Sequence, residues 1–427
     1  MVNNTSSPYK ISAFNLILLE LSLMLSVTWM VWQRLVFNTP GAWLIHVSLG
    51  SLVFLVLLKT NREFARLIVR PPFIFIGLWG LFNAVNMMFI DEWHEKGSIA
   101  NLLYPYVFAC LAAFAVRADP AKTMKCLLGA MLFYLAIFLS NSEMHMFSDA
   151  ERLIASNFNS NEIAQICVVT IVLLSIMKFL RGKIIIWQYM LMGMTSIFLV
   201  LLGSRNAAIC GFLILFAFFT LKIKSSSFST LKLLIFLLLF IYIAYMVLSY
   251  TELGIRFRNV AEESDVNTFW SRMLGERYYY YILGTDLFLK KPWTGCGFRN
   301  FIQYNPRGFS CHAEYIAQLA EGGIISFILF FAIFVPMLIK SAVCQMVDKK
   351  RTNMYLSFML LLSLMIFCIA SIISFKLDMY IILVMADYLY NLPSAADEVQ
   401  GASLTAPMTS TRKTNIFSTN QRKRVLR

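Results

Sequence analysis

Residues 162–180 read EIAQICVVTIVLLSIMKFL, an apolar run with a single basic side chain near its end. A transmembrane helix needs about 20 consecutive, mostly apolar residues to cross the hydrocarbon core of a bilayer. Similar runs recur from residue 11 almost to residue 391, and the chain is 59% hydrophobic and 14% charged, with a mean hydropathy of +0.68. Soluble domains are about half apolar and about a quarter charged. The sequence therefore predicts a polytopic membrane protein.

The charged residues predict how these apolar runs cross the membrane. We expect an all-α protein with about twelve transmembrane helices, at residues 11–32, 41–58, 73–90, 99–116, 126–140, 162–180, 184–202, 207–222, 233–250, 318–340, 354–371 and 377–391. Lysine and arginine then fall in every second connector, whereas the opposite connectors hold acidic groups such as Asp91, Glu92 and Glu143. Basic connectors stay in the cytoplasm, so both termini are predicted to be cytoplasmic. The net charge of +14 therefore indicates orientation, and it does not indicate nucleic-acid binding.

This topology divides the chain into four parts. Predicted helices one to nine lie in residues 1–250, a loop facing away from the cytoplasm in 251–317, helices ten to twelve in 318–391, and a basic cytoplasmic tail in 392–427. The tail is rich in Ser, Thr, Asn and basic residues, so we expect it to be disordered and to contact anionic lipids. Loops as long as 251–317 are uncommon unless they are functional, so the function is expected there.

The first candidate residue lies at the break between predicted helices seven and eight, where the sequence is Gly203-Ser204-Arg205-Asn206. An arginine so close to the hydrocarbon is costly, which makes Arg205 a candidate for ligand binding. The alternative is an arginine that extends its charged end to the membrane surface. An arginine on the outer side runs against the usual charge bias, which favours the ligand.

A second group of candidates lies in residues 271–298, SRMLGERYYYYILGTDLFLKKPWTGCGF. The pattern predicts a helix that starts near Arg277, ends near Pro292 and leads into a glycine turn. The guanidinium of Arg277 can bind two phosphate oxygens at once, which a lysine cannot do. Tyr278 to Tyr281 are consecutive and cannot share one helical face. Some would lie in an aromatic belt at the interface, and others inside, where a ring can stack on a sugar.

A third group runs from Cys311-His312-Ala313-Glu314-Tyr315 to Glu321 at the start of predicted helix ten. His312, Glu314 and Glu321 enter the same face of the membrane, and such a grouping suits general-base chemistry. The alternative for Glu314 is that it caps the positive end of the helix.

Two of the eight cysteines, Cys296 and Cys311, fall in the long polar loop. In an oxidising compartment they could form a disulfide beside His312. The alternative is that each thiol is buried separately. The six other cysteines lie in or beside apolar runs and are interpreted as small buried side chains.

In order and spacing these groups resemble the O-antigen ligase and Wzy-type O-antigen polymerase superfamily. The matching residues are Arg205, Arg277, Pro292, Gly295, Gly297, His312, Tyr315, Glu321, Gly323 and Ile324, and Asn161-Glu162 resembles a family Asn-Glu pair. The similarity covers roughly residues 160–330, and the flanking helices match only in topology. Ala313 departs from the family, which often has asparagine there.

The resemblance implies a metal-independent, cofactor-free glycosyltransferase of the GT-C membrane fold in a bacterial inner membrane. Its donor would be an undecaprenyl-diphosphate-linked glycan and its acceptor a glycolipid, with a chain-length regulator as a candidate partner. Arg205 and Arg277 would bind the diphosphate. His312 would orient or deprotonate the acceptor, with Glu314 as a substitute base and Asn161 and Glu321 as further candidates. No DxD-like metal site is evident, consistent with a lipid-linked donor.

Several alternatives stay open at this point. A polymerase extends another lipid-linked chain, whereas a ligase transfers the glycan to lipid A–core, and the segment from His312 to Ile324 is slightly more similar to the polymerases. A membrane transporter or lipid flippase has a comparable number of helices, although its longest loop usually faces the cytoplasm. A structural or assembly component is a further alternative.

Overall fold

The computed structural model describes residues 9, 11–32, 42–89, 98–140, 142–147, 150–155, 160–181, 186–202, 204–223, 277–311, 313–347, 352–371, 373–374 and 376–392. The chain divides into two compact units, Met1–Asn391 and Leu392–Arg427. The predicted helix at 233–250 and the predicted disorder of the tail lie outside the described residues, apart from Leu392 at the start of the tail.

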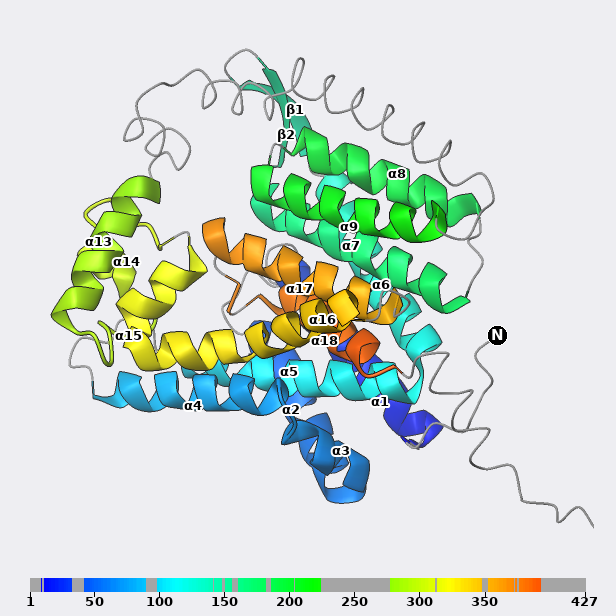
Figure 1. Ribbon diagram of the computed structural model, residues 1–427, viewed down its shortest axis with the longest axis horizontal. Helices are drawn as coiled ribbons and strands as arrows, with labels where there is room; N and C mark the ends of the chain where they lie inside the picture. Colours follow the sequence, from blue (N-terminus) through cyan, green and yellow to red (C-terminus); the bar gives the residue numbers. More distant parts are fainter. Residues whose placement is uncertain are drawn as a thin grey trace, which may run out of the picture. The chain divides into compact units, whose positions relative to one another are not determined.

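The described residues of the first unit are mainly helical (Figure 1). The N-terminal part holds α1 (Ala13–Trp32), α2 (Ala42–Thr60), α3 (Arg62–Ile68), α4 (Phe73–Met88), α5 (Ser98–Ala118) and α6 (Pro120–Ser140). After two strands come α7 (Ser160–Arg181), α8 (Ile186–Leu201) and α9 (Arg205–Ile223). The C-terminal part holds α13 (Arg277–Lys290), α14 (Phe301–Tyr304), α15 (Glu314–Ala332), α16 (Val335–Val347), α17 (Thr352–Ala370) and α18 (Leu377–Tyr390).

Several of the described helices have the length and composition of membrane-spanning segments. Five are long and apolar enough to cross a membrane, or six if α2 and α3, which are bent by 116° at their junction, form one span. At that junction the side chain of Asn61 accepts a hydrogen bond from the backbone N–H of Phe64 and so starts α3. The composition and these helices are those of a membrane protein, and the count of about twelve spans stays a prediction.

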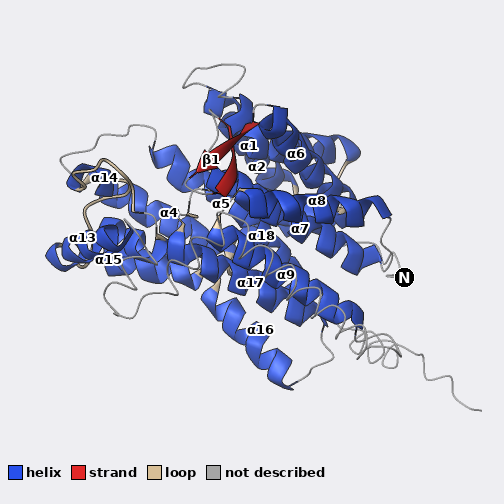
Figure 2. Ribbon diagram, turned by 90° about the horizontal axis from the view of Figure 1, so that it is seen from above, coloured by secondary structure: helices blue, strands red, loops and turns tan. Residues whose placement is uncertain are grey.

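One short β-hairpin accompanies the helices of the predicted all-α fold class. Strand β1 (Ser142–Phe147) pairs antiparallel with β2 (Ala150–Ala155), with Ser142 opposite Ala155 and Phe147 opposite Ala150 (Figure 2). Polar and apolar residues alternate through Glu143-Met144-His145-Met146, as in a strand with two different faces. The two residues between the strands are Ser148 and Asp149, which favour turns.

Helix α18 lies at the centre of the packing. It contacts α17, α5 and α7, and most of its side chains are buried, as expected of a helix that is apolar almost all round. Helix α15, which carries the third group of candidate residues, packs between α13 and α4 (Figure 1). The segment predicted as one loop over 251–317 therefore contains two helices, α13 and α14, and α15 begins at Glu314, before its predicted start at residue 318.

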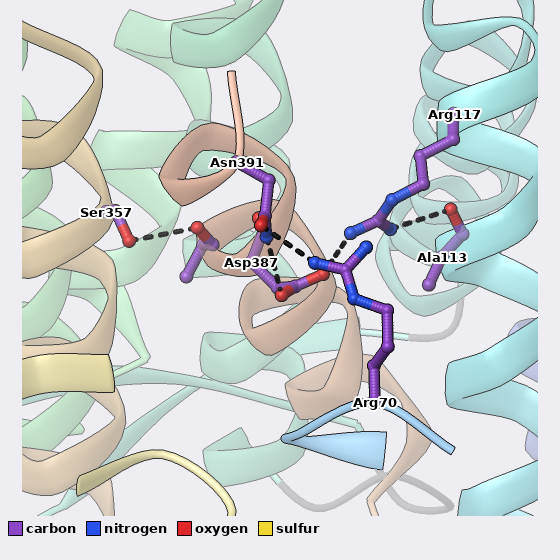
Figure 3. Close-up of polar contacts among 7 residues, drawn as sticks. Arg70, Ala113, Arg117, Ser357, Asp387 and Asn391 are labelled. Carbon is purple, nitrogen blue, oxygen red and sulfur yellow. Dashed lines mark hydrogen bonds and ion pairs between the residues drawn. The ribbon is translucent and has the colours of Figure 1, made fainter. Parts of the chain in front are cut away.

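A buried ion pair joins α5 to α18 (Figure 3). The guanidinium of Arg117 donates to the carboxylate of Asp387 and to the carbonyl oxygen of Ala113 (3.0 Å), and both charged side chains are almost fully buried. Asn391 donates its side-chain amide to the same carboxylate at 2.9 Å. Arg70, from the segment between α3 and α4, donates to Asn391 at 2.8 Å. This cluster fixes three segments that are distant in sequence.

We expect Arg117→Ala to destabilise the protein by about 3–5 kcal/mol, because it would leave the carboxylate of Asp387 buried without its cation. Thermal unfolding of the purified protein would measure this loss. Arg66→Ala is the matched control, since Arg66 forms an exposed pair with Glu63 on the surface of α3 and such pairs contribute little. Equal melting temperatures for the Arg117→Ala variant and the wild type would contradict this assignment.

Candidate functional site

Helix α15 is interrupted at Gly323, and this break organises the candidate site. The backbone of Gly323 has φ 67° and ψ −168°, a conformation that side chains larger than hydrogen rarely adopt. A Cβ atom at this position would also collide with the backbone of Trp293. Glycine is therefore required at position 323 both by the backbone conformation and by the closeness of the segment that follows α13.

The glycine turn after α13 docks directly on this break. The backbone N–H groups of Cys296 and Gly297 donate to the carbonyl oxygens of Ala320 and Glu321, each at 2.8 Å. In return, the N–H of Ile324 donates to the carbonyl oxygen of Pro292 at 2.8 Å. These bonds satisfy backbone groups that an unbroken helix would pair internally. The Pro-x-x-Gly-x-Gly segment (residues 292–297) and the Glu-x-Gly-Ile segment (residues 321–324) are thus the two sides of one backbone contact, the glycine joint.

Gly295 allows the glycine turn to approach the backbone of α15 closely. Its φ is 64°, and a Cβ atom there would overlap the backbone of Glu321. The carboxylate of Glu321 is buried and accepts a hydrogen bond from the backbone N–H of Arg299 at 2.9 Å. Arg299 itself has φ 62°. Glu321 therefore holds the end of the glycine turn against α15 from the other side.

Glu314 lies at the first turn of α15 and is completely buried. Its carboxylate accepts hydrogen bonds from the backbone N–H groups of Ile373 and Ser374 (3.0 Å for Ser374) and from the side-chain amide of Gln318 (2.6 Å). The N-cap of α15 is Ala313 and makes no side-chain capping bond. Glu314 thus binds the connector between α17 and α18, and no capping bond from its side chain to its own helix is observed.

A polar network continues from Glu314 into the helices, and sequence reasoning missed it. The oxygen of the Gln318 side chain accepts from the indole N–H of Trp79 (2.8 Å) and from the hydroxyl of Ser326 (2.6 Å). The amide of Asn83 donates to Ser326 at 2.9 Å. The available signal was the presence of Trp79, Asn83 and Gln318 within apolar runs, since buried polar groups in membrane helices need partners.

The four consecutive tyrosines point in different directions, as predicted. Tyr280 is buried against Phe301, with ring centroids 6.4 Å apart. Tyr281 donates its hydroxyl to the carbonyl oxygen of Ile369 (2.6 Å) and packs on Tyr315. Tyr279 is exposed and lies beside the guanidinium of Arg307. At least two of these rings have structural partners within the protein.

The structure brings some of the sequence candidates together and leaves others untested. Glu314 and Glu321 both lie on α15, Glu314 in its first turn and Glu321 at the glycine joint, whereas Asn161 is in the first turn of α7. Arg205 and Arg277 are the first residues of α9 and α13. Their side chains, and all of His312, lie outside the described residues, so their roles stay predictions.

Cys296 and Cys311 are both buried free thiols, so the disulfide hypothesis is not supported. Each sulfur lies near a backbone carbonyl oxygen, that of Gly297 (4.0 Å) for Cys296 and that of Ala313 (3.6 Å) for Cys311. Both belong to the cluster of buried side chains between α13 and α15. Burial raises the pKa of each thiol to about 12.

We expect both thiols to react very slowly with alkylating reagents in the folded protein. With a pKa near 12, only about one thiol in ten thousand would be ionised at pH 8, and the thiolate is the reactive form. Mass spectrometry after timed alkylation, with and without denaturant, would count them. Both should be labelled only after unfolding. A disulfide-linked peptide pair in natively isolated, unreduced protein would contradict this expectation.

The composition and fold define a helical membrane protein in which the motif-bearing segments meet at a broken helix. A family model described as O-antigen ligase matches residues 189–331, about a third of the chain. The match runs from α8 to the end of α15 and includes the glycine joint. The resemblance to the O-antigen ligase and Wzy-type polymerase superfamily is thus confirmed for this segment. Members of the family are glycosyl-transferring enzymes. A separate comparison with curated proteins finds no match to the chain.

Proposed function

We propose that this protein transfers a glycan from an undecaprenyl-diphosphate carrier to an acceptor glycolipid, as a Wzy-type polymerase of surface-polysaccharide assembly. The observation that carries the proposal is the glycine joint, in which Pro292, Gly295 and Gly297 lock onto Glu321, Gly323 and Ile324. These residues fall within the segment that matches the O-antigen ligase family. The joint sets the relation between the start of α15, next to His312, and the helix that begins at Arg277.

The proposed reaction assigns one task to each candidate. The acceptor hydroxyl oxygen attacks the anomeric carbon of the donor sugar, its bond to the phosphate oxygen breaks, and the diphosphate leaves with the bonding electrons. Arg205 and Arg277 would stabilise the negative charge that develops on the diphosphate. His312 would accept the proton from the acceptor hydroxyl. Glu314, whose carboxylate binds Gln318 and the 373–374 backbone, would position the start of α15.

The second candidate function is an O-antigen ligase, favoured by the description of the matching family. Deleting the gene and examining the lipopolysaccharide by gel electrophoresis would separate the two. A product limited to one repeat unit would support the polymerase, whereas accumulated long lipid-linked chains would support the ligase. Unchanged lipopolysaccharide and unchanged lipid-linked glycans would refute both. Transfer by the purified protein without an ion gradient would exclude a transporter.

The proposal also requires the motif-bearing segment to face away from the cytoplasm. We expect an impermeant thiol reagent, applied to intact spheroplasts, to label a cysteine placed at position 265 and to leave one at position 348 unlabelled, because basic residues surround the latter. The reverse pattern would invert the topology and overturn the assignment of the acceptor side.

A further inference from the structure

The polar network between α4 and α15 has a fixed hydrogen-bond direction. An indole N–H can only donate, so the atom of the Gln318 amide that faces Trp79 at 2.8 Å is its oxygen. The hydroxyl of Ser326 donates to the same oxygen at 2.6 Å. The NH₂ group of Gln318 is therefore turned the other way, where it donates to the carboxylate of Glu314 at 2.6 Å. Two donors, one of them on α4, thus decide which end of this amide meets Glu314.

The direction of the Ser326 hydroxyl is set in turn by Asn83 of α4. The amide of Asn83 donates to the hydroxyl oxygen of Ser326 and to the carbonyl oxygen of Trp79, each at 2.9 Å. The proton of Ser326 is then directed to Gln318 at 2.6 Å, since its other acceptor, the Asn83 oxygen, is 3.2 Å away. Gly322 provides the room, because a Cβ atom there would lie 2.2 Å from the Cβ atom of Ser326. Hydrogen bonds linked in one direction strengthen one another.

At its other end the network meets a carboxylate whose bonded partners are donors. Glu314 is completely buried and accepts from the Gln318 amide and from the backbone N–H groups of Ile373 and Ser374. A proton on this carboxyl group would find no acceptor among these three partners, so the bonds require the ionised form. All three are charge-assisted hydrogen bonds, which are stronger than neutral ones. They fix the first turn of α15 both to the network and to the connector between α17 and α18.

The network also crosses the break in α15. Glu314 and Gln318 precede Gly323, whereas Ser326 follows it. The backbone is not helical at the break, so the helix alone does not fix the first part of α15 relative to the second. The glycine joint links the two parts through backbone bonds, and this network links them through side chains.

We infer that Gln318 is a positioning residue of the proposed transfer, an inference that rests on the proposed function. Its amide passes the direction set by Trp79 and Ser326 on to Glu314, and so fixes the first turn of α15 relative to α4. His312 is two residues before Glu314, so their Cα atoms lie within about 7 Å of each other. A displacement of this turn therefore also displaces the proposed base. Glu314 contributes an acceptor here and takes up no proton.

The test exchanges the two side chains at positions 314 and 318. Gln318→Glu alone brings two carboxylates together, and Glu314→Gln alone brings two NH₂ groups together, so each single variant should have a lower melting temperature. In the double variant, the new amide accepts from the backbone N–H groups of residues 373–374 and donates to the new carboxylate. That carboxylate still accepts from Trp79 and Ser326. Every bond is thus retained, and the double variant should recover most of the melting temperature, a coupling that a double-mutant cycle measures.

Transfer by the purified full chain, expressed per folded molecule, separates positioning from a role in stability alone. Gln318→Leu should lower kcat about tenfold, because a small displacement of catalytic groups is costly. KM should stay unchanged, since Gln318 is buried and does not contact the substrate. The double exchange should restore kcat together with the melting temperature. Glu63→Gln combined with Gln345→Glu makes the same two exchanges on α3 and α16 and should change neither quantity.

Three results would overturn the inference. The first is a double variant no more stable than the single variants, and the second is wild-type kcat per folded molecule in Gln318→Leu. The third is a double variant that folds normally and transfers no glycan, which would show that position 314 needs a carboxylate as a base. Where a single variant does not accumulate, recovery of the protein in membranes by the double variant gives the same answer. If the melting temperatures follow the expected pattern and the wild type transfers no glycan, the proposed function fails while the hydrogen-bond direction stands.

Discussion

Arg277→Lys should lower glycan transfer about 100-fold even though the positive charge is retained, and Arg277→Ala should lower it about 1000-fold. The physical reason is geometric. A guanidinium offers two parallel N–H donors to two phosphate oxygens, whereas an ammonium offers a point charge that cannot reproduce the bidentate contact. The assay is transfer by purified protein, at protein levels matched by immunoblot. Near-normal polysaccharide in cells carrying Arg277→Ala at ordinary abundance would refute the assignment.

Variants of Arg205 provide a comparison for this experiment, and a variant of Arg307 provides its control. If Arg205 also binds the diphosphate, Arg205→Lys should be as harmful as Arg277→Lys. If it only extends its charge to the membrane surface, lysine should substitute well. Arg307→Ala is the control within the same segment as Arg277, because Arg307 is exposed and lies beside the ring of Tyr279. Arg299, in the same segment, is not a suitable control, since its backbone N–H binds Glu321 and its φ is 62°.

The sequence predicted the class of fold and the segments that form the candidate site. It did not predict the hydrogen bonds between those segments. The long apolar runs are visible in the sequence, and so is the spacing of the glycine, proline and glutamate residues. The two segments that carry these residues, 292–297 and 321–324, do meet in the structure. The bonds between them could not be predicted, because they join backbone groups, which every residue carries. Spacing along the chain likewise could not reveal that Glu314 binds residues 373 and 374, since that contact depends on the packing of α15 against α17.

The contacts of Glu162, Lys376 and Asp378 around one pocket and the Arg117–Asp387 pair show a second limit of sequence reasoning. Lys376 and Asp378 are adjacent to a predicted helix and look like ordinary charged residues at a membrane boundary. Their relation to Glu162 exists only because α7 and α18 pack side by side. Arg117 directly follows the predicted span 99–116 and likewise looks like a boundary charge, whereas its side chain is buried against Asp387. Charge counting predicts sidedness, and packing decides which charges have partners.

The second large effect is expected at Glu314, where Glu314→Gln should reduce both stability and transfer. The carboxylate accepts from the backbone N–H groups of Ile373 and Ser374 and from the Gln318 amide. An amide in its place would turn a donor toward at least one of these donors, and a buried unsatisfied donor costs about 1–3 kcal/mol. Glu314→Ala removes every acceptor and should be worse. We therefore expect lower melting temperatures in both variants, with the loss of transfer following the loss of folded protein.

The melting temperature and the transfer rate of the Glu314 variants together decide whether Glu314 positions α15 or acts as the base. If Glu314 were the base that deprotonates the acceptor, Glu314→Gln would also abolish transfer per folded molecule, because an amide does not take up the proton. If Glu314 positions the start of α15, the melting temperature falls and transfer per folded molecule falls less than for His312→Ala. Glu63→Gln is the matched control, since Glu63 forms a surface pair with Arg66 at 2.7 Å and such pairs contribute little. Its melting temperature should equal that of the wild type, so that any decrease at Glu314 reports the loss of the buried acceptor.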